Sequence, residues 1–150
     1  MIRPARVADI EAMHRIRLAV RENRLADPSS VGPEDYRCRL DPPALSLVAE
    51  SDGRVVGFAV GDAGSASIWA LFVDPAFEGR GTGRLLHDAL VASLFARGLT
   101  ELHLSTDPGT RAERFYRRAG WQPGSETKGS EVGYRLTPTD WIRSQGPRRA

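Results

Sequence analysis

The segment at residues 73–86, which reads VDPAFEGRGTGRLL, constrains the fold more than any other part of the chain. An apolar run leads into it, glycines follow at Gly79, Gly81 and Gly83, and leucines then recur at helical spacing. This order predicts a strand, a glycine turn and a helix. The first N–H groups of a helix have no partner within it, and glycines let a ligand approach them. The segment therefore predicts a phosphate-binding site.

Two arginines and the spacing of the glycines narrow the kind of phosphate site. Arg80 and Arg84 lie in the same turn and add positive charge. The dinucleotide fingerprint G-x-G-x-x-G fails, because its third glycine falls on Arg84 when counted from Gly79 and on Leu86 when counted from Gly81. The Walker pattern also fails, since no glycine is followed by Lys and then Ser or Thr. Both common nucleotide motifs are therefore excluded.

The segment resembles the coenzyme A loop of the GNAT-type N-acetyltransferases. That family has Gln/Arg-x-x-Gly-x-Gly/Ala after a strand that ends in Val-x-Pro. Here Val73-Asp74-Pro75 ends the strand, and Glu78, Gly81 and Gly83 occupy the three defined positions. Glu78 departs from the Gln or Arg of the family, but backbone donors carry most of the contact in such a loop.

A second motif resembles the other signature of the same family, Ala-x-x-Phe/Leu-Tyr-x-x-x-Gly-Phe. It runs from Ala112 through Tyr116 to Trp121, which stands where the family has Phe. The family also has an Asn about three residues before this Ala, where the present chain has Gly109. The two motifs follow each other in the family's order and are separated by a predicted strand.

Hydrophobic periodicity predicts a mixed α/β (α+β) sheet along nearly the whole chain. Antiparallel strands come first, and a parallel pair follows because a helix connects its two strands. This order matches the GNAT fold, in which the parallel pair splays around the acetyl-CoA site. The expected strands are residues 2–6, 44–50, 54–61, 67–73, 100–105 and 131–136, and the expected helices are residues 9–24, a short one from 33 that ends at Asp41, 82–96 and 110–119.

Length and composition favour one globular domain over residues 1–150, with a frayed tail at 145–150. The net charge of +2 is too small to indicate nucleic-acid binding, and no basic stripe is interleaved with aromatic residues. Cys38 has no second cysteine to pair with, and neither a signal peptide nor a membrane span is visible. We therefore expect a cytoplasmic protein without nucleic-acid or membrane partners, and keep a homodimer as an option.

The resemblance implies acetyl transfer from acetyl-CoA to an amine by direct attack within a ternary complex. The pantetheine arm would pair with the backbone of Leu71, Phe72 and Val73, in a strand that is bulged in the family. Tyr116 matches the general acid of the family, and a phenol is protonated at neutral pH without special tuning. The implied contacts to the remainder of the cofactor come from Glu78, Gly79, Arg80, Gly81, Thr82, Gly83 and Arg84.

The general base and the acceptor are less well defined by the sequence. Many family members have a Glu early in the strand before the glycine loop, where this chain has Ala66 and Ser67. Ser67 could hold a relay water, and Glu22 and Asn23 could reach the acceptor, a small-molecule or peptide amine. Ser67 could equally be an ordinary strand residue, and Glu22 with Asn23 could simply lie at a solvated helix end. No cluster of His and Cys suggests a metal site.

Two other functions compete with the transferase. A CoA-binding sensor or pseudoenzyme would keep the loop without transfer, and the missing strand carboxylate and Gly109 favour it. Tyr116 favours the enzyme. A nucleic-acid module is the third and weakest interpretation.

Overall fold

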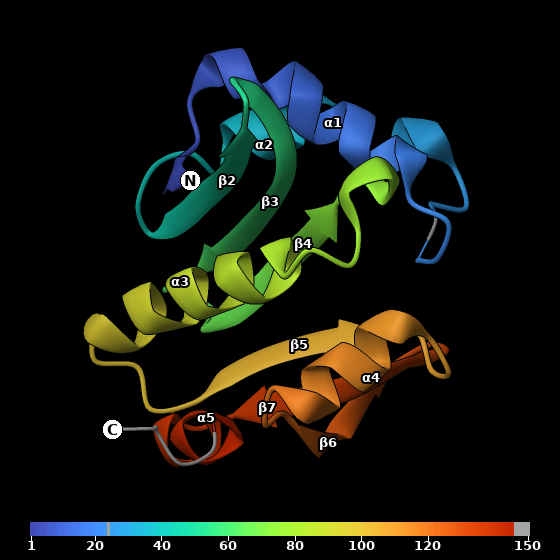
Figure 1. The fold of residues 1–150 in the computed structure, drawn as a ribbon. Helices are drawn as coiled ribbons and strands as arrows, with labels where there is room; N and C mark the ends of the chain where they lie inside the picture. Colours follow the sequence, from blue (N-terminus) through green and yellow to red (C-terminus); the bar gives the residue numbers. More distant parts are fainter. Residues whose placement is uncertain (24, 146–150) are drawn as a thin grey trace.

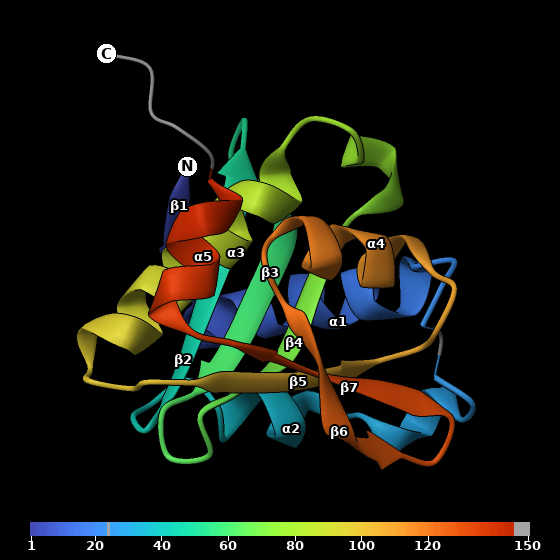
Figure 2. The same ribbon diagram turned by 90° about the horizontal axis from the view of Figure 1, so that it is seen from below.

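The computed structural model describes residues 1–23 and 25–145, which form one sheet with helices on both faces (Figures 1 and 2). Arg24 and residues 146–150, where we expected a helix end and most of a frayed tail, lie outside the described residues. The strands are β1 (Ile2–Pro4), β2 (Ala44–Ser51), β3 (Arg54–Asp62), β4 (Ser67–Val73), β5 (Leu102–Thr106), β6 (Gln122–Lys128) and β7 (Glu131–Leu136). The helices are α1 (Ile10–Ala19), α2 (Pro33–Arg37), α3 (Thr82–Ala96), α4 (Arg111–Arg118) and α5 (Pro138–Ser144), with 3-10 turns at Val7–Asp9, Pro28–Ser30 and Pro75–Phe77.

The seven strands lie in the order β1-β2-β3-β4-β5-β7-β6, and all neighbours are antiparallel except β4 and β5. These two run parallel because α3 carries the chain back between them. Within the described residues they pair at a single position, Ser67 with His103, and then diverge (Figure 1). The structure thus confirms the expected mixed sheet with one splayed parallel pair.

A β-bulge interrupts β4 close to the point where it leaves β5. Val60 of β3 pairs with Ala70, but the next residue, Gly61, pairs with Ile68, so that Trp69 is an extra residue. Trp69 and Ala70 both pack with the residues of α1 and α2, whereas Ile68 packs with those of α3. A bulge bends the strand that carries it, and this strand borders the divergence.

Two apolar clusters hold the helices against the two faces of the sheet. On one face α1 and α2 contribute Met13, Ile16 and Tyr36, which are fully buried. On the other face α3 packs through Leu86 and Leu90, which are also fully buried. Apolar residues at helical spacing therefore hold α1 and α2 on one face of the sheet and α3 on the other.

A buried polar network ties α3 to the C-terminal part of the chain. The Nε2 atom of His87 accepts a hydrogen bond from the Trp121 indole at 2.9 Å, and its Nδ1 atom lies 2.8 Å from the Asp88 carboxylate. Because an indole N–H can only donate, Nε2 carries no proton and Nδ1–H donates to Asp88. Asp88 also accepts from Trp141 of α5 at 3.3 Å. Trp121, which stands where the family has Phe, thus serves as a hydrogen-bond donor.

Several element boundaries differ from those expected. Helix α1 ends at Ala19 rather than at residue 24, because Val20 is already extended. Helix α2 ends at Arg37, before the prolines, and β5 begins at Leu102 rather than at residue 100. These differences concern element ends, where side-chain periodicity carries little information.

Two C-terminal elements were not expected from the sequence. Strand β6 contains Pro123 and Gly124, which argue against a strand, but β6 is an edge strand and tolerates a proline. Helix α5 is only one to two turns long and starts at the capping residue Thr137, whose hydroxyl accepts from the Asp140 N–H at 3.2 Å. Strand β6 forms the outer edge of the sheet, and α5 lies beside α3 and α4 (Figure 2).

Candidate active site

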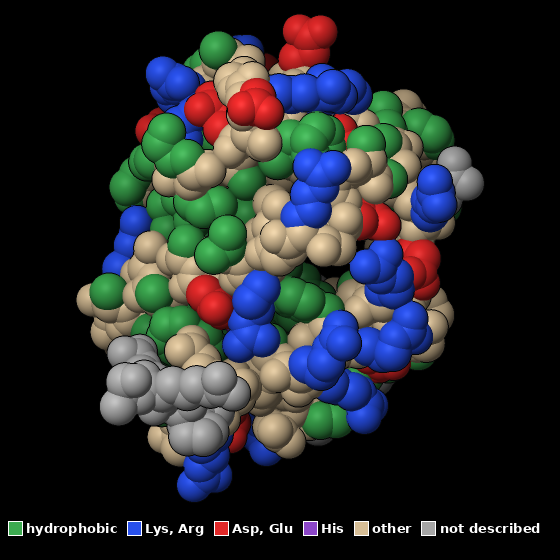
Figure 3. Space-filling model, in the orientation of Figure 1, with side chains coloured by type: hydrophobic (Ala, Val, Ile, Leu, Met, Phe, Trp, Pro, Cys, Tyr) green, Lys and Arg blue, Asp and Glu red, His purple; other side chains and the backbone are tan. Residues whose placement is uncertain are grey.

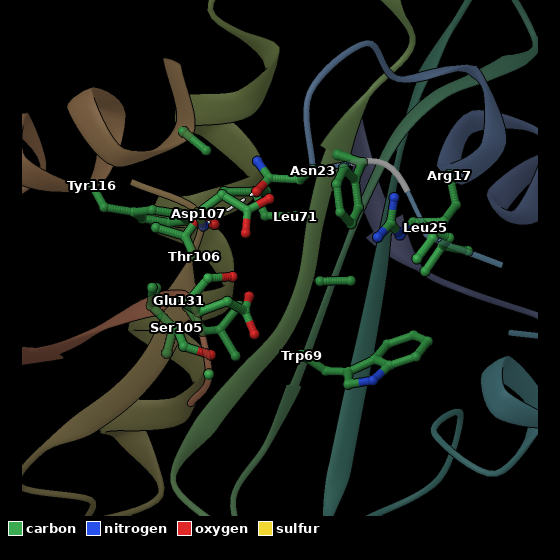
Figure 4. A pocket seen from close by; sticks show the side chains of 18 residues that line it. Arg17, Asn23, Leu25, Trp69, Leu71, Ser105, Thr106, Asp107, Tyr116 and Glu131 are labelled. Carbon is green, nitrogen blue, oxygen red and sulfur yellow. Dashed lines mark hydrogen bonds between the residues drawn. The ribbon is translucent and has the colours of Figure 1, made fainter. Parts of the chain in front are cut away.

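The divergence of β4 and β5 opens a cavity of about 530 Å³ (Figure 4). Residues of α1, β4 and the segment 23–26 line one side, and residues of β5, α4 and the β6–β7 turn line the other. In open α/β sheets, ligands bind outside the carboxyl ends of strands where the topology switches. The cavity lies at such a position.

Strand β4 presents an unpaired edge to this cavity. Beyond Ser67 no described strand pairs with it on the side that faces β5. Leu71 and Phe72, expected to make backbone contacts to a cofactor, line the cavity, whereas Val73 lies next to the glycine loop, with its Cγ2 atom 3.6 Å from the position of a Cβ on Gly83. An unpaired strand edge can bind an extended ligand that carries amides.

The glycine loop beyond β4 exposes its backbone. Gly79 and Gly81 have φ angles of +76° and +80°, and a Cβ at either position would meet no atom within 4 Å. The N–H of Leu85 makes the first hydrogen bond of α3, to the Gly81 carbonyl at 3.1 Å. The amides before it have no helical acceptor, and no side chain caps this end of α3. The amides that we expected to hold a diphosphate are therefore free of the chain's own side chains.

The charged side chains of the loop are tied to neighbouring elements. Glu78 forms an ion pair with Arg111 of α4 at 2.8 Å. Arg84 pairs with Asp88 one helical turn later at 3.1 Å, and the Arg80 guanidinium lies 4.9 Å from the centre of the Phe77 ring. Further arginines of α4 are exposed, and basic side chains gather over this helix in Figure 3. The loop therefore lies in a positive environment that suits an anion.

Tyr116 reaches the cavity from α4 and is almost completely buried, with 7% of its surface exposed. Its ring packs against Trp121, with the two ring centres 5.8 Å apart. Burial raises the pKa of the Tyr116 phenol above its ordinary value, so the hydroxyl stays protonated at neutral pH. Figure 4 shows it on the same side of the cavity as Thr106 and Asp107.

The three expected acceptor-side residues lie in different places. The Glu22 carboxylate accepts from the Arg111 N–H at 3.2 Å, and the Asn23 side chain accepts from the Asp107 N–H at 3.3 Å. Glu22 therefore connects the chain after α1 to the first residue of α4, and Asn23 connects it to the segment before α4 and lines the cavity. Ser67 lies where β4 and β5 still pair and makes a hydrogen bond to Ser65 at 2.7 Å, outside the cavity lining.

The sequence profile of the acetyltransferase (GNAT) family matches residues 10–121, most of the chain. The chain belongs to the GNAT acetyltransferase family. This family of transferases was expected from the glycine loop and the Tyr116 motif.

Individual GNAT proteins are similar over parts of the chain. An L-2,4-diaminobutyric acid acetyltransferase of Nocardia farcinica is 31% identical over 117 residues, 75% of this chain and 58% of the relative. A mycothiol acetyltransferase of Beutenbergia cavernae is 36% identical over 100 residues, 60% of this chain and 34% of the relative. The chain thus spans between a third and three fifths of the length of these curated relatives.

Solved GNAT structures share the architecture. The PaiA N-acetyltransferase of Thermoplasma acidophilum, determined in complex with coenzyme A, superposes with a TM-score of 0.79 at 16% identity. The match covers 91% of this chain and 98% of that structure. Identity at this level shows a common fold.

The cavity between β4 and β5 also contains three charged residues that were not predicted as site residues from the sequence. Asp107 follows β5 directly, Glu131 begins β7, and Arg17 projects from α1. Asp107 could have been found, because it ends a strand beside the topological switch. Glu131 could not, since the turn that brings it to the cavity depends on the unexpected strand β6.

The described residues contain neither a cluster of metal ligands nor a helix that could span a membrane. Among them no group of three or more His, Cys, Asp or Glu side chains is arranged to hold a metal ion. None of the helices in that part of the chain has the length and hydrophobicity that crossing a bilayer requires.

Proposed function

We propose that this chain transfers the acetyl group of acetyl-CoA to a primary amine by direct attack in a ternary complex. The observation that carries the proposal is the arrangement of three features: free amides at residues 79–84, the unpaired edge of β4, and Tyr116 on the other side of the cavity from that edge. The free amides suit a diphosphate. The strand edge suits an amide-bearing arm, and Tyr116 suits a leaving thiolate.

Acetyl-CoA would supply an activated thioester: the amine nitrogen bonds to the acetyl carbon, the carbon–sulfur bond breaks, the sulfur gains a proton and the nitrogen loses one. The loop amides and nearby arginines would hold the diphosphate. Leu71 and Phe72 would align the arm through their backbone, and an N–H of this bulged strand would stabilise the charge that develops on the carbonyl oxygen.

Two proton transfers are assigned to the side of the cavity formed by β5, α4 and β7. Tyr116 would donate a proton to the departing sulfur; it is buried beside the cavity, and its raised pKa means that the phenol carries that proton at neutral pH. Asp107 and Glu131 would accept the proton of the amine, directly or through water, because they are the carboxylates among the described residues that line the cavity. They replace the strand carboxylate that is absent at Ala66 and Ser67.

The similarity to relatives supports an amine as the acceptor. The relative from Nocardia farcinica is named for L-2,4-diaminobutyric acid, a compound that carries amino groups.

A thiol-release assay tests the proposal. The chain is mixed with acetyl-CoA and a panel of small amines and amine-bearing peptides, and free CoA is measured over time. We expect saturable CoA release that depends on the amine. Acetyl-CoA binding without turnover on any amine would instead support a CoA-binding sensor.

A further inference from the structure

Arg17 is a cation in the cavity with unused hydrogen-bonding capacity. It projects from α1, and its guanidinium lies 4.3 Å from the centre of the Phe72 ring. Its Nη1 atom is buried and has no hydrogen-bond partner among the described residues. Arg3, on the same face of the sheet, also has a buried Nε without a partner, but both of its Nη atoms donate to carboxylates, whereas no described residue accepts from the Arg17 guanidinium. A buried donor without a partner is costly, and a bound acceptor atom would remove that cost.

Arg17 also lies at the junction of two hollows. It lines the main cavity and a neighbouring hollow of about 320 Å³ that is formed with Leu18, Leu25, Ala26 and Pro28. A group that binds the guanidinium from the cavity would therefore sit on the side formed by α1. The side that carries Tyr116 lies opposite (Figure 4).

The charges around the cavity are separated in space. Among the described lining residues Arg17 is the only Lys or Arg, and Asp107 and Glu131 are the only carboxylates. Figure 4 shows Arg17 on one side and both carboxylates on the other. Burial lowers the pKa of Arg17, and the charge of Asp107 offsets this only in part. The guanidinium remains charged and poorly solvated, which strengthens its pairing with an anion.

We propose that the acceptor is an amine that also carries a carboxylate, with the carboxylate bound by Arg17 and the amine directed at Asp107 and Glu131. The planar guanidinium presents a fork that matches a carboxylate. A single cation balances one negative charge, so a singly charged carboxylate fits this cavity better than a dianionic phosphate. This inference rests on the proposed function, because it names the class of acceptor for the same site.

Matched pairs of amines test the inference. Lysine is compared with 1,5-diaminopentane and alanine with ethylamine, since each pair differs only in a carboxylate, and phosphoethanolamine serves as the phosphate-bearing probe. We expect kcat/KM to be at least about tenfold higher for the carboxylate member of at least one pair. In Arg17→Gln this ratio should fall to about one while the KM for acetyl-CoA stays unchanged, and Arg17→Lys should retain part of it.

Arg21→Gln is the matched control, because Arg21 is exposed after the same helix and lies outside the cavity lining. It should leave the ratio intact. Equal activity on both members of every pair, a preference for phosphoethanolamine, or an equal loss on both members in Arg17→Gln would overturn the inference and leave acetyl transfer standing.

A second readout does not need turnover. If acetyl-CoA binds but no amine releases CoA, the proposed function fails, and calorimetry with lysine in the presence of CoA then tests the carboxylate site alone. Binding that is lost in Arg17→Gln and kept in Arg21→Gln would support the site. Absence of lysine binding to the unaltered chain would overturn it.

Discussion

Tyr116 is the residue whose hydroxyl the proposed reaction needs most. Its ring is held by packing, so removal of the oxygen should change the chemistry more than the fold. In Tyr116→Phe we expect kcat to fall by about 10²-fold or more, with the Kd for acetyl-CoA changed by less than about twofold. Steady-state CoA release and calorimetry measure the two effects.

Tyr134→Phe is the control for Tyr116→Phe, because it deletes the same atom away from the cavity. The Tyr134 hydroxyl donates to Glu113 at 2.6 Å and accepts from Arg117 at 2.9 Å. Its loss should lower stability and leave kcat nearly unchanged. Equal losses of turnover and of acetyl-CoA affinity in Tyr116→Phe would show that Tyr116 only packs.

A substitution at Gly83 should affect the binding of a diphosphate and the stability of α3 in opposite directions. It lies in the first turn of α3, and a Cβ there would contact only Val73 Cγ2, at 3.6 Å. In Gly83→Asp the carboxylate should favour the helix N-terminus, by about 0.3–1 kcal/mol, yet repel an anionic ligand. We expect an unchanged or higher Tm and at least tenfold weaker acetyl-CoA binding, whereas Gly83→Ala should have a small effect on binding. Unchanged affinity in Gly83→Asp would contradict the assignment of the loop.

At the scale of elements, the end of α4 is fixed against α5 by a glycine. Gly120 has a φ angle of +100°, and a Cβ there would lie 2.6 Å from the Asp140 carbonyl oxygen. In Gly120→Ala both the backbone conformation and the contact are unfavourable, so we expect a loss of about 2–4 kcal/mol in unfolding free energy. Gly98→Ala, at a φ angle of +90° in open space, should lose only about 1 kcal/mol in urea unfolding. Equal losses would show that the contact with α5 is unimportant.

The link between β1 and α1 should make stability depend on pH. Arg3 donates to both oxygens of Asp9, at 2.8 and 2.9 Å, and these hydrogen bonds lower the pKa of the Asp9 carboxyl despite its burial. A lowered native pKa adds stability that is complete above the unfolded value of about 3.9 and is lost as the pH falls through the native value.

We therefore expect Asp9→Asn to lower the unfolding free energy by about 2 kcal/mol at pH 7. The difference from the unaltered chain should shrink as the pH falls below about 4. Urea unfolding at several pH values measures both quantities, with Glu11→Gln, at an exposed site of α1, as the control. A difference independent of pH would exclude the ionised Asp9 as its source.

Some of these elements could be predicted from the sequence and others could not. Long periodic segments such as α3 and motifs with a fixed spacing such as the Tyr116 helix were recognisable, because one helical face is apolar. Strand β6 was not, since Pro123 and Gly124 conceal an edge strand that pairs only with β7. Two site residues could therefore not be predicted. Glu131 comes to the cavity through the β6–β7 turn, and Arg17 lies at the cavity only because α1 packs over β4.

At the scale of the whole molecule, the sheet consists of two parts joined by a short parallel pair, and the core and polar contacts of α3 also hold these parts together. One part contains β1 to β4 with α1 to α3, and the other contains β5 to β7 with α4 and α5 (Figure 1). A ligand in the cavity would contact both parts and link them. Saturating acetyl-CoA should therefore raise the unfolding free energy, by about 2.7 kcal/mol at a hundredfold excess over Kd.

Thermal melts and hydrogen exchange measure this linkage. Adenosine 3′,5′-bisphosphate, which lacks the pantetheine arm, is the matched ligand. It should stabilise the chain less and should not protect β4 and β5. Equal stabilisation and protection by both ligands would argue against binding along the β4 edge.

A crystal structure with acetyl-CoA would show directly whether the cofactor binds along β4. We expect the diphosphate on the amides of residues 79–84, the arm along β4, and the thioester beside Leu71 and Tyr116. A ligand bound elsewhere on the surface, or an arm that leaves the edge of β4 unpaired, would contradict it.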